Sequence, residues 1–247
     1  MTDPQQLAIM KILASLSATA FGAFRQLFFL ITIRMTAISI NHGNMPASAL
    51  GYALYGYFLC SNHEDIEAGC QFARLGLDQV QRLDAKEWHS RVWSNAHFFV
   101  SHWKAPLKDI PDQFQAAYCK GLECGDFQNA AFSAFHGCLF PYFSGTTRNL
   151  AELQQKALPL KESALQMKQL QMIPRFNILL QAIHALRYGR TSAQYLKGEY
   201  YDEELMVPLH LQAFDFPCLF MLYLHKLLLD YLSGDFRQAV EAASNRR

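Results

Sequence analysis

Apolar residues recur at every third or fourth position along most of this chain, which is the spacing of one helix face. Between residues 126 and 143 the stripe comprises Phe127, Ala130, Ala131, Ala134, Phe135, Cys138, Leu139 and Tyr142. A second stripe comprises Leu50, Ala53, Leu54, Tyr57 and Phe58. An α-helix completes a turn in 3.6 residues, so such stripes form one face. The pattern predicts helices that each bury an apolar face.

Composition supports helices over strands. The chain has 34 Leu and 29 Ala but only 5 Val and 7 Thr. Leu and Ala favour helices, whereas β-branched residues favour strands. The breaks between stripes are short, which is typical of antiparallel neighbouring helices. We therefore expect an all-α fold of about eleven helices.

A weak internal repeat marks some of the breaks. Residues 125–131 (GDFQNAA) match residues 234–240 (GDFRQAV), and residues 61–68 (SNHEDIEA) are a looser version. The glycine can end one helix in the left-handed conformation, and the aspartate can cap the next. Asp126 and Asp235 lie 109 residues apart, about three units of the ~34-residue tetratricopeptide length, although the 61 residues from Asp65 to Asp126 do not fit. These features predict a single tetratricopeptide-like α-solenoid over residues 1–247.

Two segments depart from regular helical sequence. Pro159 lies inside the stripe of residues 150–170 and predicts a kink or a split there. Residues 189–204 form the longest irregular stretch, and it ends on the acidic run 202–204. We favour this run as the cap and first turn of the following helix over a surface for a basic partner.

Charge and cysteine content narrow the class of protein. The net charge is +1, and no basic cluster precedes the terminal arginines, which argues against nucleic-acid binding. The six cysteines form no Cys-x-x-Cys pair and mostly lie among apolar residues, as expected in a reducing compartment. The longest apolar runs, 27–33 and 218–224, are too short to span a bilayer, which needs about 20 residues. We expect a soluble cytoplasmic protein.

No motif for catalysis, a cofactor or a metal is found. The chain lacks a phosphate-binding Gly-x4-Gly-Lys loop and a Gly-x-Ser-x-Gly elbow. His89, His97 and His102 are spaced by eight and five residues, which does not suit ligands on one helix face. We therefore assign no catalytic, cofactor-binding or metal-ligating residue. A helical enzyme that uses Cys and His residues assembled by folding is the least favoured alternative.

Aromatic residues provide the candidate binding groove. Helical solenoids hold ligands and peptides on a concave face, and interface hot spots favour Trp and Tyr. Trp88, Trp93 and Trp103 lie within sixteen residues. We take Trp93, His97, Trp103 and Tyr55 as a possible interaction groove, with core packing as the more common role of such a stripe.

Several longer strings carry a family resemblance. They are residues 1–8 (MTDPQQLA), 41–56 (NHGNMPASALGYALYG), 102–107 (HWKAPL), 117–126 (AYCKGLECGD), 201–204 (YDEE) and 234–240 (GDFRQAV). Together they resemble the tetratricopeptide-like helical region of large multidomain sensor kinases that are common in cyanobacteria. In that family a serine/threonine-kinase-like domain and an AAA- or STAND-type ATPase precede the helical region, and GAF and histidine kinase domains follow it. None of the family's ATP-binding or phosphorylated residues falls within the matching strings.

The resemblance implies a non-catalytic role. We expect a protein-interaction and signal-relay module that couples a nucleotide switch to kinase output, with the ATPase, GAF or kinase domains in cis or another protein as partner. The alternative is a small-molecule-sensing domain that uses the aromatic groove. The resemblance also implies that the chain is a fragment of a larger signalling protein, whose uncapped helical ends would favour self-association.

Overall fold

The computed structural model describes residues 1–62, 64–147, 149–189 and 196–244. Within these ranges it contains twelve α-helices and no strand, apart from an isolated antiparallel bridge between Lys197 and Asp202. The helices pack in adjacent pairs, so the predicted all-α solenoid fold is confirmed. Contacts divide the predicted single region into two compact units, unit 1 from Met1 to Phe140 and unit 2 from Pro141 to Arg247.

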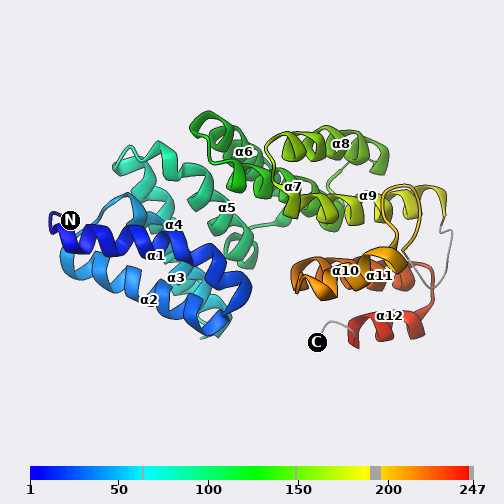
Figure 1. The fold of residues 1–247 in the computed structure, drawn as a ribbon, viewed down its shortest axis with the longest axis horizontal. Coiled ribbons are helices and arrows are strands. Elements are labelled where there is room, and N and C mark those ends of the chain that lie inside the picture. The colour runs from blue at the N-terminus through cyan, green and yellow to red at the C-terminus, as the bar shows by residue number, and fades with distance from the viewer. Residues whose placement is uncertain (63, 148, 190–195, 245–247) are drawn as a thin grey trace. The chain divides into compact units, whose positions relative to one another are not determined.

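Unit 1 contains the first six helices and most of the seventh (Figure 1). They are α1 (Pro4–Ala23), α2 (Arg25–His42), α3 (Pro46–Asn62), α4 (Ile66–Arg82), α5 (His89–Phe99), α6 (Pro111–Cys124) and α7 (Phe127–Ser144). Short 3-10 turns lie between α4 and α6: η1 (Lys86–Trp88), η2 (Ser101–Trp103) and η3 (Leu107–Asp109). Two of these turns, η2 and η3, border the candidate site.

The centre of unit 1 is the close contact between α3 and α4. A Cβ added at Gly56 would lie 2.5 Å from the Gly69 carbonyl oxygen, and one added at Gly76 would lie 2.6 Å from the Ala49 carbonyl oxygen. The two backbones therefore approach too closely for any side chain at these glycines. Such close approach is possible because small residues recur at three- and four-residue spacing on both helices, which places them on one face of each.

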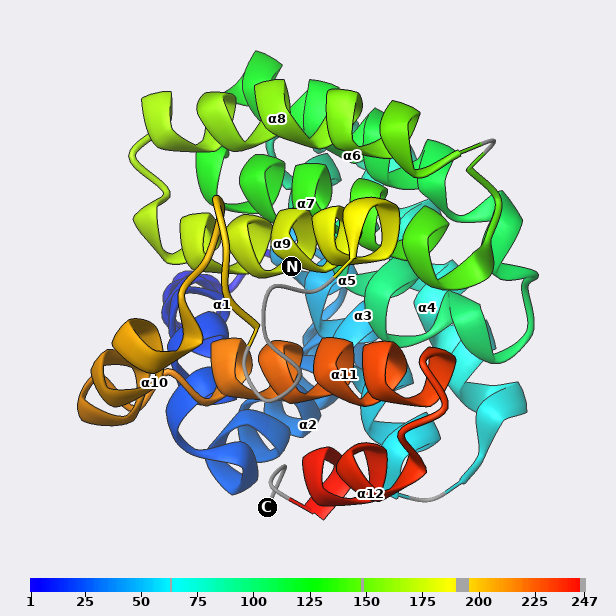
Figure 2. The ribbon, with the colours of Figure 1, turned by 90° about the vertical axis from the view of Figure 1, so that its right-hand side faces the viewer.

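Most helices of unit 2 lie side by side in a stack (Figure 2). After the end of α7 it contains α8 (Leu150–Gln166), the 3-10 turn η4 (Leu170–Met172), α9 (Ile173–Tyr188), α10 (Glu203–Gln212), α11 (Phe216–Leu232) and α12 (Phe236–Ser244). α9 packs against both α8 and α11, and α11 also packs against α10 and α12. The fully buried Phe176 and Leu222 come from the two central helices, α9 and α11.

The predicted Gly-Asp turn recurs with the expected geometry. Gly125 and Gly234 both adopt positive φ, 74° and 80°. Asp126 and Asp235 then cap the next helix, each accepting a hydrogen bond at Oδ1 from the backbone nitrogen three residues on. The looser version also caps, because Asp65 Oδ1 accepts from Ala68 N at 3.0 Å.

In two turns of this kind the left-handed residue is not glycine. Glu64 precedes Asp65 with φ of 54°, and Phe214 precedes the capping residue Asp215 with the same φ. The internal repeat found in the sequence did not include the second of these turns, because that turn lacks the glycine. The left-handed conformation is strained for Glu and Phe, so packing of the flanking helices must hold it.

The remaining sequence expectations for the fold can now be compared with the structure. Pro159 does not split its helix, since α8 runs from Leu150 to Gln166 with the proline inside. The acidic run behaves as a helix start, because Asp202 caps α10 and accepts from Glu204 N and Leu205 N. Of the long irregular stretch, residues 190–195 lie outside the described part of the chain.

Candidate functional site

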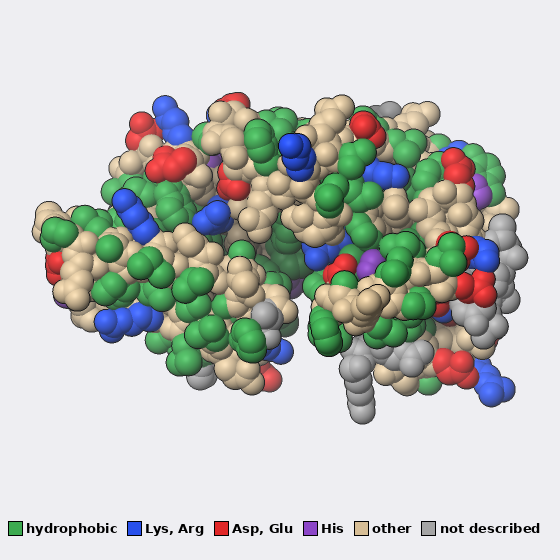
Figure 3. Space-filling model, viewed as in Figure 1, with side chains coloured by type: hydrophobic (Ala, Val, Ile, Leu, Met, Phe, Trp, Pro, Cys, Tyr) green, Lys and Arg blue, Asp and Glu red, His purple; other side chains and the backbone are tan. Residues whose placement is uncertain are grey.

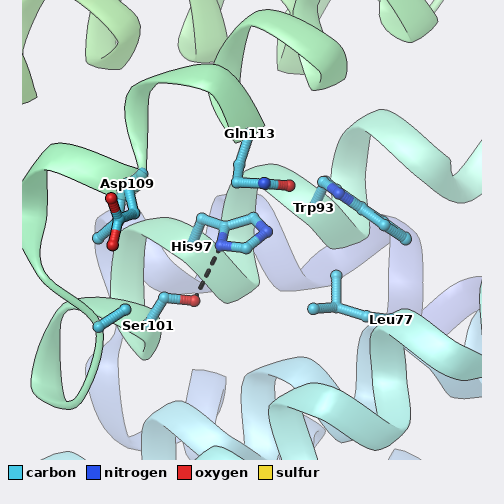
Figure 4. A pocket seen from close by; sticks show the side chains of 8 residues that line it. Leu77, Trp93, His97, Ser101, Asp109 and Gln113 are labelled. Atoms are coloured by element: carbon cyan, nitrogen blue, oxygen red, sulfur yellow. Dashed lines mark hydrogen bonds between the residues drawn. The ribbon is translucent and has the colours of Figure 1, made fainter.

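A pocket of about 300 Å³ opens in unit 1 beside α5 (Figure 4). It is lined by Leu77, Trp93, His97, Ser101, Ala105, Asp109, Ile110 and Gln113. Trp93 and His97 are one helical turn apart on α5, so their side chains lie on the same face. The other polar residues come from the two 3-10 turns and the first turn of α6. The pocket is thus assembled from α5, η2, η3 and α6, with Leu77 added from α4.

The predicted groove is only partly assembled. Trp93 and His97 both line the pocket, whereas Trp103 and Tyr55 do not. Trp103 is 47% exposed, and its ring lies against that of His102. Tyr55 packs edge-on against Phe72 at 4.8 Å, between α3 and α4. A binding role for these four residues stays a prediction.

His97 is the polar centre of the pocket. Its Nδ1 shares a hydrogen bond of 2.9 Å with the Ser101 hydroxyl, while its buried Nε2 has no hydrogen-bond partner among the described residues. Burial, and secondarily the neighbouring His89, lower the pKa of His97 to about 4. The imidazole is therefore neutral at neutral pH and offers one free nitrogen to a ligand.

An aromatic wall lies next to this free nitrogen. The His89 ring stacks on the Trp93 indole, with centroids 4.0 Å apart and an interplanar angle of 14°. Asp109 is exposed, and Gln113 lies close above the His97 ring (Figure 4). The arrangement can hold a small ligand that contacts the indole and forms one hydrogen bond at His97. Sequence reasoning missed Asp109 and Gln113, because their approach to α5 depends on the path of the 3-10 turns.

One group of potential metal ligands occurs among the described residues, and it lies in unit 2. The ligand atoms of His210, Asp215 and Cys218 all lie within 4.8 Å of one another. Sequence analysis assigned no metal-ligating residue and placed Cys218 among buried apolar residues. The cysteine is indeed fully buried.

Many of the large exposed apolar side chains of unit 1 lie along α1 and α2. We call it the α1–α2 face, and it consists of Ile12, Leu16, Leu27, Leu30, Ile33 and Ile40, which are 39–66% exposed. Figure 3 shows apolar side chains gathered over these two helices. Their charged residues are Lys11, Arg25 and Arg34, all exposed, and neither helix contains an acidic residue. The face is thus apolar with basic residues beside it.

None of the described helices combines the length and apolar character that crossing a bilayer requires. The apolar stretches of α2 and α11 are partly buried within their units. Phe28 and Met35 of α2 are buried, as are Cys218 and Leu229 of α11, while other apolar residues on the same helices stay exposed.

Three comparisons with known proteins complete the description of the site. They covered models of protein families, curated proteins and solved structures. In none of them does this chain find a match.

Proposed function

We propose that this chain is a non-catalytic interaction module whose α1–α2 face docks onto another protein domain. The observation that carries the proposal is the exposure of large apolar side chains along two neighbouring helices. Leu30 and Ile40 are 64% and 66% exposed. Large apolar side chains that gather on the surface often mark an interaction site.

The energetics favour a covered face. Burying apolar surface contributes about 25 cal/mol per Å², so covering several large side chains yields several kcal/mol. The hydrophobic effect is non-directional, however, and does not select a partner. Selection requires charge, and Lys11, Arg25 and Arg34 provide it. We infer a partner surface with an apolar centre and acidic residues around it.

The family resemblance suggests which partner to test first. In sensor kinases of that kind the helical region connects an ATPase domain to GAF and histidine kinase domains. Docking of the α1–α2 face on one of these domains would couple the nucleotide switch to kinase output. The helix-pair fold suits this role, because stacked helices form extended binding surfaces.

The test is a titration calorimetry experiment with the full chain. The ligands are recombinant ATPase and GAF-containing segments of a sensor kinase of the resembled family from the same genome. We expect one segment to bind, and Leu30→Glu to weaken that binding at least about tenfold, or 1.4 kcal/mol. Val240→Glu on α12 is the matched control, since Val240 is 66% exposed but lies in unit 2.

Three outcomes would contradict the proposal. The first is no binding to either segment, and the second is equal weakening by Leu30→Glu and Val240→Glu. The third is binding to phosphatidylserine vesicles but to neither protein segment, because a basic apolar face can also associate with an anionic membrane surface. Circular dichroism of each variant establishes that the fold is retained.

A second candidate function is small-molecule sensing at the pocket beside α5. Its volume reaches the lower end of the range for ligand sites. The unpartnered Nε2 of His97 favours this reading, because buried polar groups normally have partners. A metabolite screen by thermal shift and tryptophan fluorescence tests it. A ligand should raise the melting temperature of the wild type but not of His97→Phe, and a screen in which nothing shifts the wild type argues against sensing.

A further inference from the structure

The junction between α10 and α11 brings three metal-ligating side chains together. α10 ends at Gln212, and Phe214 adopts the left-handed conformation that turns the chain back. The backbone nitrogen of Asp215 then donates to the His210 carbonyl oxygen at 2.9 Å. This turn places the Asp215 side chain against the last turn of α10, where His210 lies.

Each of the three side chains faces the other two. His210 Nδ1 lies 3.4 Å from Asp215 Oδ2. The Cys218 sulfur lies within 4.8 Å of the ligand atoms of both His210 and Asp215. His210 is 4% exposed, Cys218 is fully buried, and the Asp215 side chain is 25% exposed. The carboxylate therefore provides the route by which an ion from solvent reaches the cluster.

Capping alone does not account for this arrangement. Asp215 Oδ1 caps α11 by accepting from Cys218 N at 3.3 Å, which leaves Oδ2 for His210. That role requires neither a thiol nor a buried imidazole. His210 Nε2 is buried and has no hydrogen-bond partner among the described residues. The other ring nitrogen, Nδ1, faces the Asp215 carboxylate and is the atom that an ion bound between the two side chains would contact.

A fourth polar group borders the cluster. The Tyr201 ring lies parallel to that of His210, with an angle of 11° and 6.3 Å between centroids. The Tyr201 hydroxyl also lacks a partner in the described part of the chain, and it lies near enough to the Cys218 and Asp215 side chains to interact with them electrostatically. Two independent polar atoms at this junction are thus unsatisfied.

The donor set determines the class of ion. Imidazole nitrogen, carboxylate oxygen and thiolate sulfur together suit Zn²⁺ and similar borderline cations, whereas Ca²⁺ and Mg²⁺ take oxygen ligands. Tetrahedral zinc holds its ligand atoms about 3.5 Å apart, so ligand atoms within 4.8 Å need only small side-chain adjustments. A carboxylate and a thiolate would balance the two charges of the ion.

We propose that His210, Asp215 and Cys218 bind a zinc-type divalent cation that fastens α10 to α11. Water or the Tyr201 hydroxyl takes the fourth position. The site lies in unit 2 and is independent of the docking role proposed for unit 1.

The experiment uses the full chain, stripped with a chelator under reducing conditions and titrated with Co²⁺. We expect one Co²⁺ per chain, with the visible absorption of tetrahedral cobalt and a near-ultraviolet thiolate-to-cobalt band. Zn²⁺ should displace the cobalt and raise the melting temperature. Cys218→Ser should abolish the thiolate band, whereas Cys60→Ser, which removes another buried thiol, should retain it.

A second variant keeps the proposal testable even if Cys218→Ser fails to fold. Asp215→Asn keeps the helix cap, because Asn and Asp cap equally well, but removes the charge that binds the ion. We expect Asp215→Asn to keep its helix content and to bind Co²⁺ at least about tenfold more weakly, or 1.4 kcal/mol. The proposal is wrong if the wild type shows no cobalt bands, if Cys218→Ser keeps the thiolate band, or if Asp215→Asn binds as tightly as the wild type.

Discussion

The α3–α4 pair of unit 1 and the α10–α11 pair of unit 2 are held together by different chemistry. α3 and α4 meet through small residues and leave no room for a Cβ at Gly56 or Gly76. α10 and α11 are joined by polar groups, among them a buried ion pair between Glu203 and Lys226 at 2.6 Å. The first contact depends on the close fit of two helix backbones, and the second depends on the pairing of opposite charges. Their responses to substitution should therefore differ.

The largest expected effect is at the buried ion pair. Glu203 is 7% exposed at its side chain, and its second oxygen accepts from Leu196 N. Glu203→Ala leaves a buried lysine without this carboxylate, which costs about 3–5 kcal/mol of unfolding free energy. Glu204→Ala removes a half-exposed pair with Lys197 and should cost less than about 1 kcal/mol. Urea denaturation compares the two, and equal losses would refute the role of burial.

The α3–α4 contact should be destabilised by a side chain that overpacks it. Gly76→Ala places a Cβ against the backbone of α3, and such overpacking costs about 1–3 kcal/mol although alanine is the better helix former. Gly22→Ala is the matched control, since nothing lies within 4 Å of its added Cβ. It should stabilise by up to about 1 kcal/mol. If Gly76→Ala instead raises the free energy of unfolding, the contact between α3 and α4 has room for a Cβ and this prediction is wrong.

The α11 helix should also make stability depend on pH. Burial lowers the pKa of the fully buried His225 from 6.5 to about 4. The unfolded chain therefore takes up a proton first, so stability is constant above pH 6.5 and falls as the pH drops from 6.5 towards 4. Because of His225, the free energy of unfolding should fall by about 2 kcal/mol between pH 7 and pH 5. His225→Phe should flatten the pH profile of the melting temperature, and an unchanged profile would contradict this. His97 contributes in the same direction.

The smallest effect concerns a feature that the two helix pairs share. Glu64 and Phe214 hold the same left-handed conformation in the turns that join α3 to α4 and α10 to α11. Glu64→Gly and Phe214→Gly should each stabilise by about 1 kcal/mol, because glycine adopts this conformation without strain. Phe214 is 74% exposed, so little packing is lost. Gly125→Ala should destabilise by a similar amount. In thermal melts, both glycine variants should therefore melt above the wild type, and Gly125→Ala should melt below it.

Much of the fold was predictable, whereas little of the candidate site was. The stripe from Leu50 to Phe58 became part of α3, and Gly125 and Gly234 end their helices as expected, because period and turn chemistry act over a few residues. Trp93 and His97 were grouped with Trp103 and Tyr55 by residue type, and these two share the pocket because they lie one turn apart on α5. Trp103 lies in η2 and Tyr55 packs against Phe72 from α3, so neither lines the pocket.

By itself the sequence determined the helices, most of their caps and the absence of strands in the described chain, since these depend on neighbours within about one turn. Only the tertiary structure decided where one unit ends and the next begins, and which polar groups lose their contact with water. His210, Asp215 and Cys218 lie within nine residues, yet their convergence required a left-handed phenylalanine that no local preference predicts. Side-chain proximity across a turn depends on the angle between two helices, and packing of the whole unit sets that angle.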